Sequence, residues 1–175
     1  MSIFVLLFSC KKELPPINKK KVEFPSRTLI NANIINKDSG RISGNLRSPL
    51  IEMYETVDSP YTVFRKGLDL DFYQKGSTKP GYFQADWGRL SDVTGIYEGR
   101  GNVIIVNEKG DSLKSEQLFW NKKNKTVYTS KEVYLISNEG DSLTAKNGLQ
   151  ATDDLETYTL FNNQGFKYVD DNQKF

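Results

Sequence analysis

The residues of this chain that most resemble catalytic groups are two serines in a repeated tetrapeptide. Gly110-Asp111-Ser112-Leu113 recurs as Gly140-Asp141-Ser142-Leu143. A serine becomes a nucleophile when a general base, most often histidine, removes its proton. The chain contains no histidine, so neither serine has the usual base. The two serines are therefore weak candidates for hydrolysis.

The same tetrapeptide occurs in the GDSL esterases, but its repetition here favours a structural interpretation. The two copies lie 30 residues apart, each between two apolar segments. Glycine permits the positive φ of a tight turn, and aspartate bonds to turn backbone. We therefore predict that both copies are turns between strands, with the leucine starting the next strand.

Six aspartates are the remaining candidates for acid–base chemistry. A glycosidase needs two facing carboxyl groups, roughly 5 to 10 Å apart. The sequence does not show that any two of them meet, and the four in the C-terminal part are expected in exposed loop or tail positions. The aspartates are Asp69, Asp71, Asp153, Asp154, Asp170 and Asp171. Without histidine, and with a single cysteine, the chain also lacks the usual metal ligands. We therefore predict a protein that is not an enzyme and that binds no metal or cofactor.

The elements around the tetrapeptides form a repeated unit. Residues 103–113 match residues 133–143 without a gap, and a fainter copy begins near residue 83. A fixed period of this length indicates a supersecondary unit that buries its apolar face against its neighbours. The unit is strand, Gly turn, strand, Asn/Lys turn, strand.

Short strand-like segments separated by turn residues occupy the rest of the chain. We expect strands at 28–34, 41–46, 50–54, 61–64, 68–73, 82–87 and 96–98. No window shows sustained helical spacing of apolar residues, so an all-β sandwich or barrel is predicted. The segments 103–106 and 133–136 are apolar on both faces. One face is expected to meet the core and the other a partner or ligand.

The first 27 residues differ in composition from the rest of the chain. Leu7-Phe8-Ser9-Cys10 resembles a bacterial lipobox, which implies lipidation of Cys10. The apolar run before it is shorter than the ~20 residues of a spanning helix. The run therefore also fits the end of a longer signal anchor or a frayed terminus. Residues 11–27 contain Pro15-Pro16 and three consecutive lysines, as in an extended tether.

At 175 residues the chain has the length of one domain with a tail. We expect a truncated signal and flexible tether at 1–27, a β domain at 28–169 and a polar tail at 170–175. The net charge of +2 is small and the charges are interspersed, so no nucleic-acid partner is predicted.

An ordered series of positions resembles the OstA/LptC/LptA family. The series is Gly101-Asn102-Val103-x-Ile105, Gly110-x-x-Leu113-x-Ser115-x-x-Leu118-x-Trp120, Val127-x-Thr129-x-x-x-Val133-x-Leu135 and Gly148-Leu149. It covers about residues 28–168 and is most similar to the LptC branch, which has an N-terminal anchor, a short tether and one domain. The resemblance implies a single twisted, open β-jellyroll of antiparallel strands. Its apolar interior would hold the acyl chains of lipid A.

The resemblance also implies site residues. The inward, lipid-binding face would comprise Val103, Ile105, Leu113, Leu118, Val127, Val133, Leu135, Leu143 and Leu149. An ordinary dry β-core would use the same residues. Arg89, Arg100 and Lys131 are candidate rim cations for phosphate and sugar. Gly101 and Gly148 match family glycines and are expected to permit a bulge or close backbone approach.

The implied function is that of a periplasmic, membrane-anchored bridge component, with the inner membrane as the expected site. It would receive lipopolysaccharide from the periplasmic domains of an ABC transporter permease and pass it to an LptA-like protein by edge-to-edge docking. The LptC branch has a spanning N-terminal helix, which a lipidated Cys10 would replace here. The chain has no Walker-type loop, so ATP would be used by another subunit. The alternative is a periplasmic or surface β-sandwich lipoprotein that binds protein or glycan.

Overall fold

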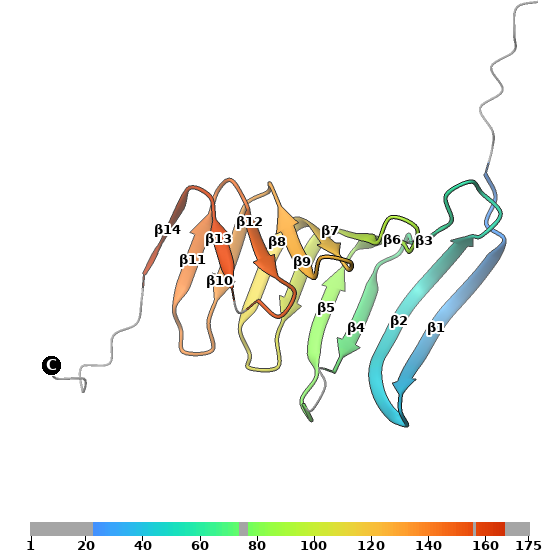
Figure 1. The fold of residues 1–175 in the computed structure, drawn as a ribbon, viewed down its shortest axis with the longest axis horizontal. Coiled ribbons are helices and arrows are strands. Elements are labelled where there is room, and N and C mark those ends of the chain that lie inside the picture. The colour runs from blue at the N-terminus through green and yellow to red at the C-terminus, as the bar shows by residue number, and fades with distance from the viewer. Residues whose placement is uncertain (1–22, 74–76, 156, 167–175) are drawn as a thin grey trace, which may run out of the picture.

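The structure is a computed structural model that describes residues 23–73, 77–155 and 157–166. This part of the chain is entirely β, with fourteen antiparallel strands in one sheet. The predicted all-β fold is confirmed, and the arrangement is consistent with a jellyroll-like β-sandwich (Figure 1). The strands are β1 Arg27–Asp38, β2 Arg41–Tyr54, β3 Tyr61–Phe64, β4 Leu68–Phe72, β5 Gly81–Ala85, β6 Trp87–Ser91, β7 Ile96–Val106, β8 Ser112–Asn121, β9 Thr126–Thr129, β10 Val133–Ile136, β11 Ser142–Ala145, β12 Leu149–Thr152, β13 Tyr158–Leu160 and β14 Asn163–Phe166.

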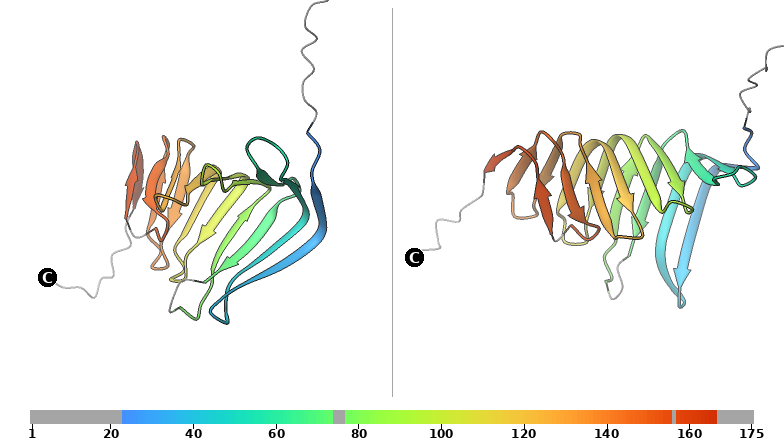
Figure 2. Two further views of the ribbon diagram at one scale, coloured as in Figure 1. Left: turned by 45° about the vertical axis from the view of Figure 1, so that its right-hand side comes forward. Right: turned by 45° about the horizontal axis from the view of Figure 1, so that its top comes forward.

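Three long strands carry the chain through two layers of a folded sheet. β2, β7 and β8 each pair with different neighbours along their two halves: β7, for example, pairs with β6 at one end and β5 at the other. Layer A comprises the strands β3, β6, β9, β12 and β13, together with the halves of β2, β7 and β8 that adjoin them. Layer B comprises β4, β5, β10, β11 and β14 with the other halves. β1 pairs along the whole of β2, and both strands curve strongly (Figure 2).

All connections between the described strands of the two layers lie along one side, which we call the fold line. β3 leads into β4, β5 into β6, β9 into β10, β11 into β12 and β13 into β14 along this side. The hairpin turns within each layer lie on the opposite side, which we call the hairpin side. Within the described residues, no strand joins the layers there.

The two layers pack closely where glycines leave space. A Cβ at Gly88 of layer A would lie 2.8 Å from Cδ2 of Leu68 in layer B. A Cβ at Gly99 would lie 2.9 Å from Cζ of Phe83. Both glycines therefore face inward, and larger side chains of the opposite layer fill the space beside them.

The 30-residue repeat is confirmed by the strand register. Ile105 pairs with Leu113 in the first copy, and Leu135 pairs with Leu143 in the second. Phe83 of β5 also pairs with Ile105, from the side of β7 opposite to Leu113. The fainter third copy therefore occupies a place in β5 equivalent to that of Leu113 in β8. Each repeat therefore adds one hairpin to layer B with the same residues facing inward.

Both Gly-Asp-Ser-Leu tetrapeptides form hairpin turns, as predicted. The φ angle is +96° at both Gly110 and Gly140, in the left-handed region that glycine tolerates. In the first turn the Asn107 side chain accepts a hydrogen bond from the Asp111 amide at 2.9 Å. The next strand begins one residue before the predicted leucine, at Ser112 in β8 and at Ser142 in β11.

The two turns are also joined to each other. Oδ1 of Asp111 accepts a hydrogen bond from the Asn138 amide at 3.0 Å, and Nδ2 of Asn138 donates to the Lys109 carbonyl at 2.9 Å. Hydrogen bonds from the Asn107 side chain and the Asn138 amide lower the pKa of Asp111. Asp111 thus links the two neighbouring turns.

The boundary predicted at Ser48-Pro49 is wrong, because β2 runs through it. Pro49 has no N–H to pair, and no register partner joins it to β1, where Asn31 has a φ of +51°. The Leu50 amide donates instead to Oγ of Ser48 at 3.3 Å. The strand bends here, at the fold line, without ending.

The predicted strand at 82–87 is interrupted at Asp86, where the chain crosses between layers. The Asp86 amide donates to the Gly101 carbonyl at 3.0 Å, and Nδ2 of Asn102 donates to Oδ2 of Asp86 at 2.7 Å. Gly101 has a φ of +71°, and a Cβ there would lie 2.9 Å from Oδ2 of Asp86. The register of β7 shifts at this point, between Arg100 and Val103.

Gly148 lies at the fold line between β11 and β12, where two backbone segments meet. Its φ is +89°, and a Cβ there would lie 1.9 Å from the Thr129 carbonyl oxygen. No other residue type fits this position without moving the backbone.

Three predicted features fall outside the described residues. They are the lipidation of Cys10, the tether up to residue 22 and the tail from residue 170. The part of the chain that the structure describes contains no helix long and apolar enough to cross a membrane.

Candidate functional site

The inward faces of the two layers carry the hydrophobic core cluster of the domain. Side chains alternate between the two faces of a strand, so the register determines which residues share a face. In layer B, one inward row crosses the strands β2, β4, β5, β7, β8, β10 and β11 in turn. Its members are Leu46, Leu70, Phe83, Ile105, Leu113, Leu135 and Leu143.

All nine residues predicted for the inward face lie on it. Five come from layer B and three from layer A, and Val103 stands where β7 enters layer B. Seven of the nine are buried: Val103, Ile105, Leu113, Leu118, Val127, Val133 and Leu149. The other two, Leu135 and Leu143, are half-buried near the C-terminal end of the sheet.

The seven buried residues belong to one hydrophobic cluster with members from both layers. Leu113 and Val133 are 0% exposed, so they contact protein on all sides. A further apolar molecule reaches these side chains only if the layers separate. Leu135 and Leu143 are accessible without such a movement.

The three predicted rim cations do not surround the apolar interior. Gly88 and Gly99 face inward, so the next residues, Arg89 and Arg100, face outward from layer A. Lys131 is exposed in the connection between β9 and β10, at the fold line. The prediction took their charge into account but did not resolve the parity of their strands.

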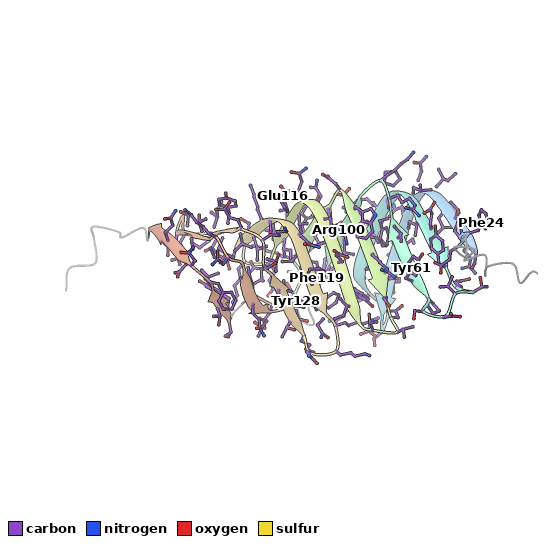
Figure 3. All side chains as sticks on the ribbon, turned by 90° about the horizontal axis from the view of Figure 1, so that it is seen from above. Phe24, Tyr61, Arg100, Glu116, Phe119 and Tyr128 are labelled. Carbon is purple, nitrogen blue, oxygen red and sulfur yellow. The ribbon has the colours of Figure 1, made fainter. Side chains whose placement is uncertain are left out.

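Both arginines instead pack on aromatic rings of the outer surface. Cζ of Arg89 lies 4.3 Å from the ring centroid of Tyr61, and Cζ of Arg100 lies 4.5 Å from that of Trp87. Nε of Arg100 also donates to Oε1 of Glu98 at 2.6 Å. Figure 3 shows this face of layer A, with Tyr61 and Arg100 labelled. These cations therefore stabilise the outer surface.

The two aspartates of β4 form part of a polar network on the outer face of layer B. Nη1 of Arg47 lies 2.6 Å from Oδ2 of Asp71, and the Tyr82 hydroxyl donates to Oδ1 of Asp69 at 2.7 Å. Partial burial and the hydrogen bond to Asp69 raise the pKa of Tyr82 to about 12. Each carboxylate thus has a structural partner in this network.

The sheet has unpaired edges at both ends of the described chain. β1 pairs only with β2, β13 only with β12, and β14 only with β11. The N-terminal end therefore presents one long edge strand that runs along both layers. The C-terminal end presents a separate short edge in each layer.

One polar cluster on the hairpin side was not recognised in the sequence. Tyr97 and Trp120 pair across β7 and β8 and lie in edge-to-face contact, with ring centroids 5.3 Å apart. Nζ of Lys122 donates to the Tyr97 hydroxyl at 3.2 Å. In the sequence, Lys122 was recognised only as part of the Asn/Lys turn of the repeated unit. The register that brings Tyr97 beside this turn was the missing information.

No known protein family matches the chain, and no curated protein is significantly similar to it. Among the described residues, no three acidic, cysteine or histidine side chains gather closely enough to hold a metal ion. The class of protein is therefore defined by the fold itself: an all-β domain whose two layers are joined along one side and enclose an apolar interior.

Proposed function

We propose that the domain binds the acyl chains of lipopolysaccharide between its two layers and acts as an LptC-like bridge component. It receives the lipid from the periplasmic domains of an ABC transporter permease and passes it to an LptA-like protein. The observation that carries this proposal is the combination of an apolar interior with layers joined along one side only. The backbone connections leave the hairpin side free to widen.

The energetics favour an exchange of apolar contacts. Separating the layers exposes residues such as Leu113 and Val133, which costs about 25 cal/mol per Å² of apolar surface. An acyl chain that enters the interior covers the same surface and adds ~0.8 kcal/mol for each of its own buried CH₂ groups. Binding therefore needs no catalytic group, and the half-buried Leu135 and Leu143 offer the first contacts.

The unpaired edges support docking to partners at both ends. A strand with free N–H and C=O groups readily accepts another strand, and β-augmentation uses this property for recognition. β1 and the pair β13 and β14 are such edges at opposite ends of the sheet. A neighbouring domain added at each end would extend the apolar interior beyond this chain. Anchoring to the membrane would come from the N-terminal segment, outside the described residues.

Site-specific photocrosslinking tests the proposal. A photoreactive residue at Leu135 faces inward and is half-buried, whereas the same residue at the adjacent Tyr134 faces outward. Ile105 and Ile104 form a second inward and outward pair. We expect lipopolysaccharide to crosslink at Leu135 and Ile105, with little crosslinking at Tyr134 and Ile104.

Two results would contradict the proposal. One is equal crosslinking at inward and outward positions, which would indicate adsorption on the surface. The other is the absence of lipid crosslinks at both inward positions in a complex that transports lipid. Circular dichroism of each variant controls for loss of the β fold.

Protein binding over the outer face is a second candidate function. Tyr134 and Ile136 are 47% and 42% exposed on the outer face of layer B, and β8 separates them from the outward Ile104 and Val106 of β7. Tyr134 and Ile136 belong to one of the two segments whose second face the sequence analysis expected to meet a partner or ligand. Under this alternative, crosslinks to a protein form at Tyr134, and lipid crosslinks form at no inward position.

A further inference from the structure

The hairpin side of layer A contains an indole N–H without an acceptor. Trp120 on β8 pairs with Tyr97 of β7 on one side and with Val127 of β9 on the other. Its Nε1 is buried and has no hydrogen-bond partner within the described residues. A buried donor without a partner is unfavourable, so an oxygen atom of a ligand would find a ready donor here.

The aromatic ring that contacts this indole belongs to Tyr97, which carries a polar cluster. Nζ of Lys122 lies 3.2 Å from the Tyr97 hydroxyl oxygen and 5.6 Å from the centroid of its ring. The Tyr97 hydroxyl donates in turn to Asp92. Val127, Trp120 and Tyr97 are thus cross-strand neighbours in one row over β9, β8 and β7, and the Lys122 ammonium contacts the Tyr97 hydroxyl beside this row. Tyr and Trp side chains with this arrangement suit a boundary between apolar and aqueous surroundings.

A second lysine is fixed beside the first. Nζ of Lys123 donates to the Val93 carbonyl at 3.1 Å. Its methylene groups cover Gly95, where a Cβ would lie 2.9 Å from Cγ of the lysine. The Val93 side chain itself is 55% exposed. An exposed apolar side chain next to fixed ammonium groups matches both parts of an amphiphile.

The cationic group is limited to these two lysines. Lys125 belongs to the same hairpin, but its backbone carbonyl accepts a hydrogen bond from the Asp153 amide. The acidic residue Asp153 of the following hairpin therefore lies next to Lys125. Near Lys122 and Lys123, the acidic residue among the contacts described is Asp92. The corner formed by Lys122, Lys123, Tyr97 and Trp120 therefore carries excess positive charge.

We propose that this corner binds the phosphate-bearing head group of an amphiphile whose chain lies between the layers. Lys122 and Lys123 pair with the phosphate, since ammonium groups bond strongly to phosphate oxygens. The Trp120 N–H donates to the oxygen that joins the head group to the chain. This inference rests on the proposed function, because it requires the chain to enter the interior.

The test compares three probes by isothermal titration calorimetry. n-Dodecyl phosphate and n-dodecyl glucoside carry the same chain, and only the first carries an anionic head group. Inorganic phosphate carries the anion without a chain. We expect the wild type to bind dodecyl phosphate about tenfold more tightly than dodecyl glucoside, and to bind inorganic phosphate much more weakly than either.

Matched variants assign the preference to the corner. The double variant Lys122→Gln and Lys123→Gln should lose about tenfold in affinity for dodecyl phosphate and none for dodecyl glucoside. Lys114→Gln and Lys131→Gln remove the same charge from exposed positions on the outer face and fold line, and should change neither affinity. Trp120→Phe should weaken both alkyl probes, because both carry an oxygen at the first carbon.

The outcomes separate this inference from the proposed function. If both alkyl probes bind and the Lys122/Lys123 variant keeps the phosphate preference, the head-group site is wrong while chain binding stands. If inorganic phosphate binds as tightly as dodecyl phosphate, the corner is a site for free anions and the inference is also wrong. If neither alkyl probe binds, the interior does not take an acyl chain and the proposed function fails with it.

Discussion

Replacing Gly148 by alanine tests how the fold line holds the two layers. Gly140 provides a matched control, because its φ of +96° is close to the +89° of Gly148. A Cβ at Gly140 meets nothing within 4 Å, whereas a Cβ at Gly148 would lie 1.9 Å from the Thr129 carbonyl oxygen. The two substitutions share the backbone strain and differ in the steric overlap.

The expected magnitudes result from these two contributions. The left-handed conformation costs alanine roughly 1–2 kcal/mol, and the loss of unfolded-state entropy offsets about 0.4–1 kcal/mol of this. Gly140→Ala should therefore destabilise the domain by about 1 kcal/mol. Gly148→Ala must also displace β9 from β12, where Thr129 pairs with Leu149 and both are buried. Overpacking and weakened pairing should add about 2–4 kcal/mol.

Urea unfolding monitored by tryptophan fluorescence measures the difference. With an m-value of about 1–3 kcal/mol/M, Gly148→Ala should lower the midpoint by roughly 1 M or more relative to Gly140→Ala. Equal midpoints for the two variants would refute the reasoning. They would mean that the connection between β11 and β12 moves without cost, and that the fold line is not a rigid joint.

Three further predictions concern the polar network, the turns and the packing of the layers. The pKa of Tyr82 is raised to about 12, so its stabilising contribution is present below about pH 10 and is lost as the pH rises towards 12; Tyr82→Phe should remove this part of the alkaline slope in urea midpoints. The pKa of Asp111 is lowered, so its contribution is present at neutral pH and is lost as the pH falls through the acid range; Asp111→Asn should cost about 1 kcal/mol at pH 7 and flatten the acid slope. Gly99→Val should destabilise by about 1–3 kcal/mol, because its side chain would overlap Phe83 across the layers; a thermal midpoint equal to that of the wild type would contradict the close packing.

The repeated pattern allowed much of the fold to be predicted. Two copies of one strand-turn-strand unit, 30 residues apart, placed β7, β8, β10 and β11 and identified the turns at Gly110 and Gly140. These features depend on local spacing, which a sequence states directly. The nine inward residues came instead from the resemblance, because segments 103–106 and 133–136 are apolar on both faces and alternation alone does not assign their inward side.

The path of the chain between the layers was not predictable in the same way. Pro49 and the Gly101 segment look like strand boundaries, yet β2 and β7 continue through them. A proline ends a strand only where its missing N–H is needed, and at the fold line Pro49 has no register partner. The outward orientation of Arg89 and Arg100, and the contact of Lys122 with Tyr97, depend on this same crossing.

The exposure of Leu143 results from its place near the end of the repeat. Leu113 and Leu143 occupy equivalent positions, but Leu113 has apolar neighbours in its row on both sides, Ile105 and Leu135. The last strand, β14, places Gly165 opposite Leu143, so the edge strand contributes no side chain to the row. A Cβ at residue 165 would lie 2.3 Å from the Ser142 carbonyl oxygen, so the backbone leaves no room for one. Within the described residues, the apolar row of layer B therefore stops at Leu143, and Leu143 stays half-buried although it has the same apolar character as Leu113.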